Sequence, residues 1–140
     1  MKSTPLFLSL FLTALAMILV GCPATGEFDL QIAFPDQESK DLCKQVEIFV
    51  FAAPAGVEQP CGSFADFRGD ENSVNLDLVA QAELPIPLAA GAAPSLADVP
   101  VGRLAFVGLG FNAQTLSLLR SCEVVELDPV ESLQVEISLD

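Results

Sequence analysis

Apolar residues recur at every second position over several stretches beyond residue 26, and helical spacing is nearly absent. A period of two is typical of strands half buried against a core. The alternation predicts six strands, at residues 28–34, 46–51, 74–78, 103–111, 118–127 and 133–139. A seventh strand lies near residues 84–88 or near residues 116–118, and the sequence leaves both places open. Because Pro, Gly, Asn and Asp separate the short strands, we expect an all-β fold, a single antiparallel β-sandwich of about six to seven strands over residues 27–140.

The longest interruptions of the pattern are residues 53–72 and 83–102, which we interpret as loops. The second predicted strand is apolar on both faces at its end, so we expect it at the centre of a sheet. Phe64 and Phe67 are predicted to anchor the first loop on the core. No repeat and no linker divides the chain, which favours one domain.

The stretch LADVPVGRLAF, at residues 96–106, resembles the strand entry of carboxypeptidase-regulatory and transthyretin-like sandwich modules. In those modules a leucine, an acidic residue, valine, proline and glycine precede an alternating strand, and an aromatic residue usually stands where this chain has Leu104. The resemblance implies a β-sandwich and says little about activity, because fold alone does not fix function. The local chemistry agrees, since Pro100 fixes a turn, Gly102 permits unusual backbone angles and alternation begins directly afterwards.

The N-terminal segment has the character of an export signal. Residues 1–5 carry one basic residue, and residues 6–20 are apolar apart from Ser9 and Thr13. Such a segment is typical of secretion signals. The alternative is a permanent transmembrane helix, but crossing about 30 Å of hydrocarbon takes about 20 apolar residues, which is more than this run provides.

The run ends in LVGC, at residues 19–22, which resembles the lipobox of bacterial lipoproteins. The resemblance implies that residues 1–21 are a cleaved signal peptide and that Cys22 carries a diacylglycerol thioether and often a further acyl chain, such as palmitate, on its amino group. Two or three chains make a lasting anchor, because each buried methylene contributes about 0.8 kcal/mol. The alternative is a buried or disulfide-forming Cys22. By the same resemblance, Pro23 favours the outer membrane over the inner one.

Composition narrows the chemistry of the exported part. The chain holds ten Phe but no His, Trp or Tyr. It therefore lacks the commonest general base, the base of Ser-His and Cys-His pairs and the commonest zinc ligand, so we expect neither catalysis nor a cofactor. Nineteen acidic and five basic residues follow residue 21, and five minus nineteen gives a formal charge of −14. Nucleic acid is disfavoured as a partner, because phosphates require clustered cations.

Three cysteines remain once Cys22 is lipidated, and an exported protein lies where disulfides persist. Three single pairings of Cys43, Cys61 and Cys122 are open. If successive strands alternate in direction, Cys61 and Cys122 lie at the end where the first strand begins, and Cys43 lies at the other. Strand parity therefore favours a Cys61–Cys122 disulfide and a free Cys43 thiol. Scattered thiols without histidine give no metal site and no activated catalytic thiol.

The acidic loop residues offer two weaker motifs. Residues 68–70 read Arg-Gly-Asp, the integrin-binding tripeptide, which we interpret as a polar turn because a three-residue match is common by chance. Residues 66–72 contain four side chains with oxygens that calcium accepts, but the ordered Asp-x-Asp-x-Asp-Gly pattern of a calcium loop is missing. Neither motif predicts a site.

The other acids stand at alternate positions of the predicted strands, where solvated faces are the simplest interpretation. They are Glu47, Asp77, Glu123, Glu126 and Glu136. Two of them would act as a glycosidase pair only if a cleft held them a few ångströms apart. A small envelope hydrolase with paired carboxylates is therefore the alternative function.

The main hypothesis is a lipid-anchored protein of the cell envelope, with an acidic β-sandwich as a binding or structural module. Residues 22–26 form a tether of at most about 14 Å, at roughly 3.5 Å per residue, so the end where the first strand begins lies against the membrane. Parity puts the loop at residues 53–72 at this end. It puts residues 35–44 and 83–102 at the opposite end. We expect a protein partner at residues 83–102, because prolines limit the flexibility of the apolar residues there.

Overall fold

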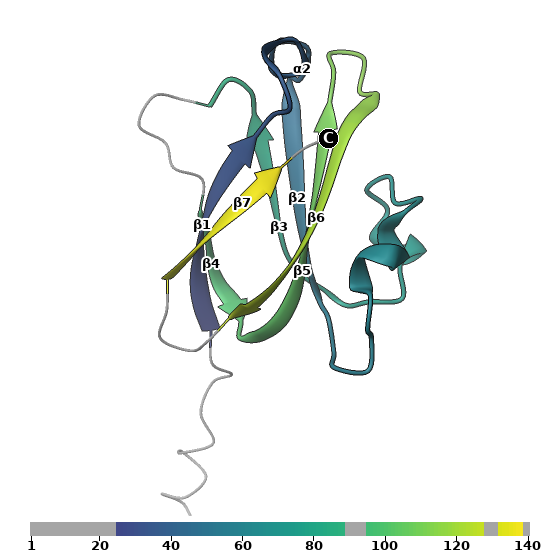
Figure 1. Ribbon diagram of the computed structural model, residues 1–140, viewed down its shortest axis with the longest axis vertical. Coiled ribbons are helices and arrows are strands. Elements are labelled where there is room, and N and C mark those ends of the chain that lie inside the picture. The colour runs from purple at the N-terminus through teal and green to yellow at the C-terminus, as the bar shows by residue number, and fades with distance from the viewer. Residues whose placement is uncertain (1–24, 89–94, 128–131, 139–140) are drawn as a thin grey trace, which may run out of the picture.

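The computed structural model describes residues 25–88, 95–127 and 132–138. These residues form a β-sandwich of seven strands with one short α-helix (Figure 1), which confirms the predicted all-β sandwich. Two 3-10 helices lie in the longest loop. The elements are β1 (Thr25–Ala33), α2 (Gln37–Leu42), β2 (Gln45–Ala52), η1 (Pro60–Phe64), η2 (Glu71–Ser73), β3 (Leu78–Pro85), β4 (Ser95–Pro100), β5 (Gly102–Phe111), β6 (Ser117–Leu127) and β7 (Ser132–Ser138).

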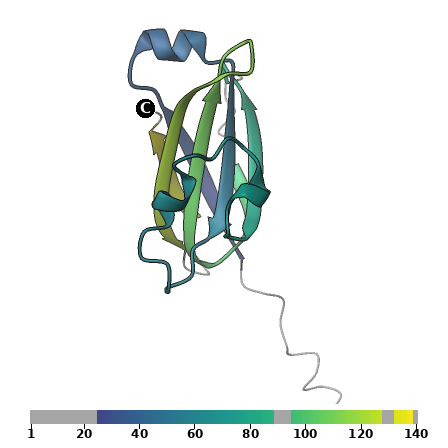
Figure 2. The ribbon, with the colours of Figure 1, turned by 90° about the vertical axis from the view of Figure 1, so that its right-hand side faces the viewer.

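The strands form two sheets, a three-stranded sheet in the order β4-β1-β7 and a four-stranded sheet in the order β3-β2-β5-β6. We call the end where β1 begins the base, and the end that carries α2 the distal end (Figures 1 and 2). All strand pairs are antiparallel except β1 and β7, which run parallel from Glu27 opposite Ser132 to Ala33 opposite Ser138. The expectation of a purely antiparallel sandwich is wrong at this pair, because the chain crosses from β6 at the base to the other sheet and runs upward beside β1.

The strand that alternation misses is β4, which falls inside the segment predicted as a loop over residues 83–102. It has six residues, and Asp98 in its middle has a φ of 58°. This left-handed residue coincides with a shift in the pairing of β4 with β1, so the alternation breaks where a bulge breaks the ladder. Because β4 adds one reversal, β5 runs towards the distal end and β6 runs back to the base, opposite to the directions expected from parity.

The third predicted strand, at residues 74–78, begins too early. Leu78 opens β3, whereas Val74 and Leu76 lie in the preceding loop and pack on the outer face of the four-stranded sheet. The apolar residues alternate here because an irregular segment buries every second side chain, and not because the segment is a strand. Residues 84–88, one of the two places left open for a seventh strand, contain only the end of β3.

The main core lies between the two sheets. Phe28 of β1 and Phe106 of β5 are fully buried, and their ring centroids lie 4.6 Å apart in an edge-on arrangement. Inward-facing side chains of β2, Val46, Ile48 and Val50, belong to the same cluster. Such aromatic pairs add about 0.5–1.5 kcal/mol beyond the burial of their area, so this contact is central to holding one sheet on the other.

A second cluster covers the outer face of the four-stranded sheet. Phe49 and Phe51 of β2 face outward there, and Phe64 and Phe67 of the following loop lie on them, with ring centroids of Phe49 and Phe67 5.0 Å apart. We call residues 53–77 the cover loop. Both the central position of β2 and the anchoring role predicted for the two loop phenylalanines are confirmed.

The two ends of the sandwich are closed differently. At the distal end, the Asp36 carboxylate caps α2 by accepting a hydrogen bond from the Ser39 N–H at 2.7 Å, and this bond lowers the pKa of Asp36. At the base, a Cβ on Gly26 would lie 2.6 Å from a methyl carbon of buried Leu127. Only glycine therefore lets the start of β1 approach the end of β6 this closely.

The inner core gives a direct test of the packing. Phe106→Ala should lower the free energy of unfolding by about 3–5 kcal/mol, because it removes a fully buried ring and leaves a cavity against Phe28. Chemical denaturation followed by circular dichroism measures this change. Leu118→Ala is the matched control, since this side chain is 43% exposed, and the change there should stay within about 0.5 kcal/mol. Equal losses in both variants would contradict the described core.

Candidate functional site

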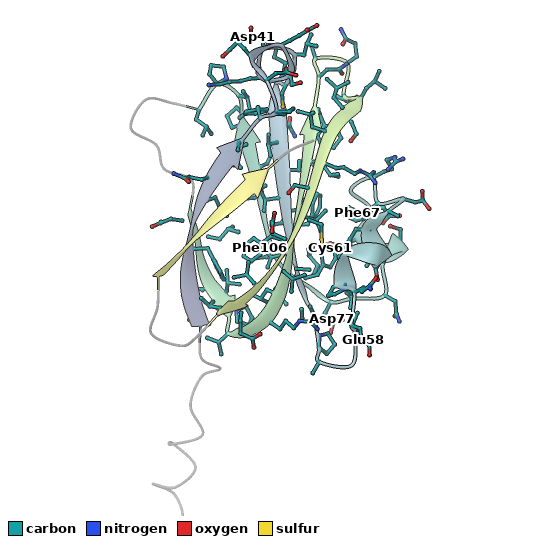
Figure 3. All side chains as sticks on the ribbon, in the orientation of Figure 1. Asp41, Glu58, Cys61, Phe67, Asp77 and Phe106 are labelled. Atoms are coloured by element: carbon teal, nitrogen blue, oxygen red, sulfur yellow. A yellow bond between two sulfur atoms is a disulfide. The ribbon has the colours of Figure 1, made fainter. Side chains whose placement is uncertain are left out.

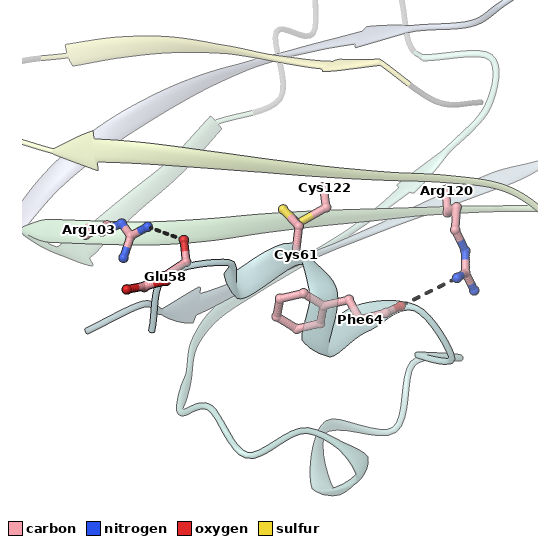
Figure 4. Close-up of a disulfide and its surroundings, with 6 residues drawn as sticks. All are labelled: Glu58, Cys61, Phe64, Arg103, Arg120 and Cys122. Carbon is pink, nitrogen blue, oxygen red and sulfur yellow. Dashed lines mark hydrogen bonds between the residues drawn. A yellow bond between two sulfur atoms is a disulfide. The ribbon is translucent and has the colours of Figure 1, made fainter. Parts of the chain in front are cut away.

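A disulfide joins the cover loop to the sheet beneath it. Cys61 in η1 and Cys122 in β6 are bonded, with their Cα atoms 5.7 Å apart and a sequence separation of 61 (Figure 4). Cys43 is the free cysteine among the described residues. The pairing that the sequence analysis favoured is therefore the one in the structure.

The parity argument for that pairing is nevertheless wrong. Because β6 runs from the distal end to the base, Cys122 lies in the middle of an eleven-residue strand rather than near the base. Cys61 does not lie at the base either, since the cover loop leaves β2 there and turns back over the outer face of the sheet (Figure 2). The two cysteines meet on that face because the loop is drawn over Phe49 and Phe51.

Two arginines hold the cover loop on either side of the disulfide (Figure 4). The Arg103 guanidinium on β5 donates to the carbonyl oxygens of Val57 and Glu58, at 2.7 and 3.4 Å. The Arg120 guanidinium on β6 donates to the carbonyl oxygens of Phe64, Ala65 and Phe67, at 3.5 Å for Phe64 and 3.0 Å for Phe67. An irregular loop leaves backbone carbonyls without ladder partners, and a guanidinium supplies several donors at once. The sequence analysis missed this role, because no local motif marks an arginine that binds distant carbonyls.

The free thiol of Cys43 is buried beside the distal end of β5. Its Sγ atom donates to the carbonyl oxygen of Gln45 at 3.4 Å. Burial raises the pKa of Cys43, and the reactive thiolate is accordingly disfavoured. The environment is that of a structural cysteine.

The Arg-Gly-Asp tripeptide forms a turn on the cover loop. Gly69 has a φ of 98°, and a Cβ there would lie 3.7 Å from the Phe49 ring, so the turn rests on the sheet. The Arg68 guanidinium donates to the neighbouring Phe67 carbonyl at 3.1 Å, and the Asp70 carboxylate accepts from the Asn72 N–H at 3.0 Å. In the described parts of the chain, no group of three or more His, Cys, Asp or Glu is placed to hold a metal ion.

Two pairs of carboxylates occupy related positions on the surface. Glu47 and Glu83 are opposite in the β2–β3 ladder, and the Gln45 amide donates to Glu47 at 3.0 Å. Asp77 and Glu126 line an open depression of about 700 Å³ at the base, together with Arg103. The side chains of this second pair are exposed, so the depression does not exclude water from them. The side chain of Glu136, in β7, lies outside the described residues.

The distal end carries three exposed leucines. Leu42 at the end of α2 is 53% exposed, Leu116 in the turn between β5 and β6 is 61% exposed, and Leu118 at the start of β6 is 43% exposed. Thr115 in the same turn has a φ of 61°, which is unusual for a β-branched residue. The sequence analysis placed residues 116–118 only as a possible strand and did not predict their exposure.

The segment predicted to meet a partner, residues 83–102, also reaches the distal end but is not one loop. Residues 83–85 end β3, and residues 95–100 form β4. Between them, residues 86–88 are described and residues 89–94 lie outside the described residues. The backbone N–H of Ile86 donates to the Lys44 carbonyl at 2.9 Å, which ties the start of this connection to the beginning of β2. The lipobox and the signal segment, at residues 1–22, also lie outside the described residues.

Comparisons with known proteins add little. No protein-family model matches the chain, and a search of curated proteins finds no match, so the resemblance of residues 96–106 to carboxypeptidase-regulatory and transthyretin-like modules is not shown. Among solved structures, the T6SS lipoprotein TssJ1 from Pseudomonas aeruginosa aligns with 13% identity over 85% of this chain and 95% of its own, with a TM-score of 0.44. At this level of likeness neither fold nor function carries over. No helix in the described segments is long and apolar enough to cross a membrane.

Removing the disulfide should destabilise the fold by about 4 kcal/mol in the chain-entropy model, because the bond closes a loop of about 60 residues in the unfolded chain. The Cys61→Ser/Cys122→Ser variant and the reduced protein should show the same lowered melting temperature by calorimetry. Cys43→Ser is the control, because it keeps the disulfide, and its melting temperature should fall on reduction by as much as that of the wild type. A melting temperature of the wild type that is unchanged by reduction would contradict a stabilising role for the bond.

Proposed function

We propose that the protein is a lipid-anchored protein of the bacterial cell envelope, with the outer membrane as the favoured site. Its acidic β-sandwich acts as a binding or structural module without catalysis. The observation that carries the proposal is the LVGC sequence at residues 19–22, at the end of an apolar segment and directly ahead of a folded domain. A lipid anchor with two or more chains would keep this domain at a membrane surface.

The start of the fold supports a close anchor. Because β1 begins at Thr25, only Pro23 and Ala24 separate it from Cys22, and the expected tether of residues 22–26 loses its last two residues to the strand. Three steps of extended chain reach at most about 11 Å, at roughly 3.5 Å each. Gly26 is packed on Leu127, so the tether ends on a fixed part of the base. An acylated Cys22 would hold the base against the membrane.

The distal end is then the surface that a large partner reaches most easily. We place the partner contact at residues 83–102, where β3 turns towards β4. Exposed Leu42, next to Asp41 at this end (Figure 3), and exposed Leu116, directly before β6, add apolar area to the contact. Leucines held on a helix and a tight turn bind at a low entropic cost, because they are already ordered.

Cys22→Ser should abolish lipidation and leave an uncleaved or mis-sorted precursor, because the cysteine thiol is the acceptor of the lipid in the lipobox family. Mass spectrometry of membrane-extracted protein should find wild-type Cys22 as the modified first residue. Cys43→Ser is the matched control and should be processed normally. An unmodified Cys22 in the mature wild-type protein would contradict the anchor.

Photo-crosslinking from the membrane-anchored protein tests the distal contact. A crosslinker at Ala90, within residues 83–102, should capture a protein partner, whereas one at exposed Asp66 on the cover loop should not. The reason is geometric, since the cover loop lies along the side and base of the sandwich (Figure 2). Capture of the partner only from Asp66 would overturn the assignment of the distal end.

A further inference from the structure

The outer edge of β6 is a free strand edge of unusual length. β6 has eleven residues and is the last strand of its sheet, and no other strand in the described part of the chain pairs with its outer side (Figure 2). Two other edge strands carry a proline, Pro85 in β3 and Pro100 in β4, whereas β6 has none. Proline at an edge limits pairing with another chain, and an edge without it is a template for an added strand.

The inward-facing positions of β6 are polar in the middle of the strand. Glu123 pairs in register with Phe106 and Ser121 with Gly108, so both residues stand on the face of β6 that looks into the sandwich. Phe106 is fully buried in the core, but Glu123 is exposed, because β6 forms the rim of its sheet. The carboxylate of Glu123 is therefore exposed to solvent on the inward-facing side of an edge strand.

A charge in this position selects what can pair with the edge. A second copy of the chain, or a partner strand with an apolar or acidic residue opposite Glu123, would desolvate the carboxylate without compensation. A lysine or arginine at that position supplies the missing charge. The chain has a formal charge of −13, so long-range attraction also favours a cationic partner.

We propose that the free edge of β6 binds an extended, basic segment of another protein by strand addition, with a lysine or arginine opposite Glu123. Main-chain hydrogen bonds to the edge give affinity, and the charge pair at Glu123 gives selectivity. Val124, which is 40% exposed on the other face of β6, offers an apolar contact to the next residue of the added strand. This side surface is separate from the distal end and does not depend on the anchor.

The test uses the full chain in detergent micelles and a fluorescent peptide of alternating lysine and valine. The peptide should bind, and binding should weaken as salt rises. Glu123→Lys should reduce the affinity at least about tenfold, the size of one charge-pair contribution of about 1.4 kcal/mol. The same variant should gain binding of a peptide that alternates glutamate and valine. Circular dichroism and the melting temperature establish that the variant is folded.

Glu126→Lys is the matched control, because it makes the same change of charge on the same strand but on the outer face, where residue 126 pairs with Arg103. It should change the affinity by less than about threefold, since only long-range attraction is altered. Equal losses in the two lysine variants would show general attraction to an acidic surface and would overturn the proposal. So would equal binding of a lysine-proline peptide, which cannot form a ladder.

Two further outcomes are decisive. If the wild type binds no alternating basic peptide while Glu123→Val self-associates, Glu123 serves only to keep copies of the chain apart, and the proposal fails. If Cys22→Ser binds the peptide as the wild type does, edge binding is supported whether or not the protein is lipidated. Failure of the anchor and failure of the edge are thus distinguished.

Discussion

The fold depends on the burial of β2 and β5 on both faces. Phe106 and Ile48 point towards the three-stranded sheet, while Phe49, Phe51 and Val107 point the other way. A two-sheet sandwich covers only one face of each sheet, so a further layer is needed over these outward side chains. The cover loop is that layer, and its irregular backbone explains the other unusual features of this side. Carbonyls without ladder partners require donors, which Arg103 and Arg120 provide, and a loop of this length gains from the disulfide that fixes it.

The alternation of apolar and polar residues predicted much of the sandwich, because most strands bury the side chains of one face. The predicted strands at residues 46–51, 103–111 and 118–127 lie within one residue of β2, β5 and β6. The bulge at Asp98 hid β4, since a left-handed residue shifts the side chains that follow to the other face. The parallel pairing of β7 with β1 has no local signal at all, because it depends on where the chain crosses between sheets.

The features of the candidate site divide in the same way. Phe64 and Phe67 were predictable as anchors, because two large apolar residues in a loop gain free energy by burial against an apolar surface. The disulfide was predicted through a wrong count of strands. Because the prediction missed β4, it placed Cys122 at the wrong end of the sandwich. Cys122 nevertheless lies half-buried on the outer face of β6, under the cover loop, and there it meets Cys61. The arginine bonds were not predictable, since a guanidinium selects carbonyls by their place in space and not by sequence distance.

The use of arginine on the cover loop also shapes the surface of the domain. Of the five cations after residue 21, Arg103 and Arg120 are engaged by loop carbonyls, and Lys44 donates to the carbonyl oxygen of Asp41 at 2.6 Å. Because nineteen acidic residues follow residue 21 and only these five cations do, most carboxylates have no cation to pair with. On the proposed anchor, the base lies at most about 11 Å from the acylated residue, which is close to one Debye length, roughly 8 Å at physiological salt. Because the tether holds the base at the bilayer, repulsion between anionic headgroups and the carboxylates of the domain disfavours a flat orientation and favours an upright long axis. The edge of β6, which runs along that axis, then stays clear of the bilayer and open to an extended segment.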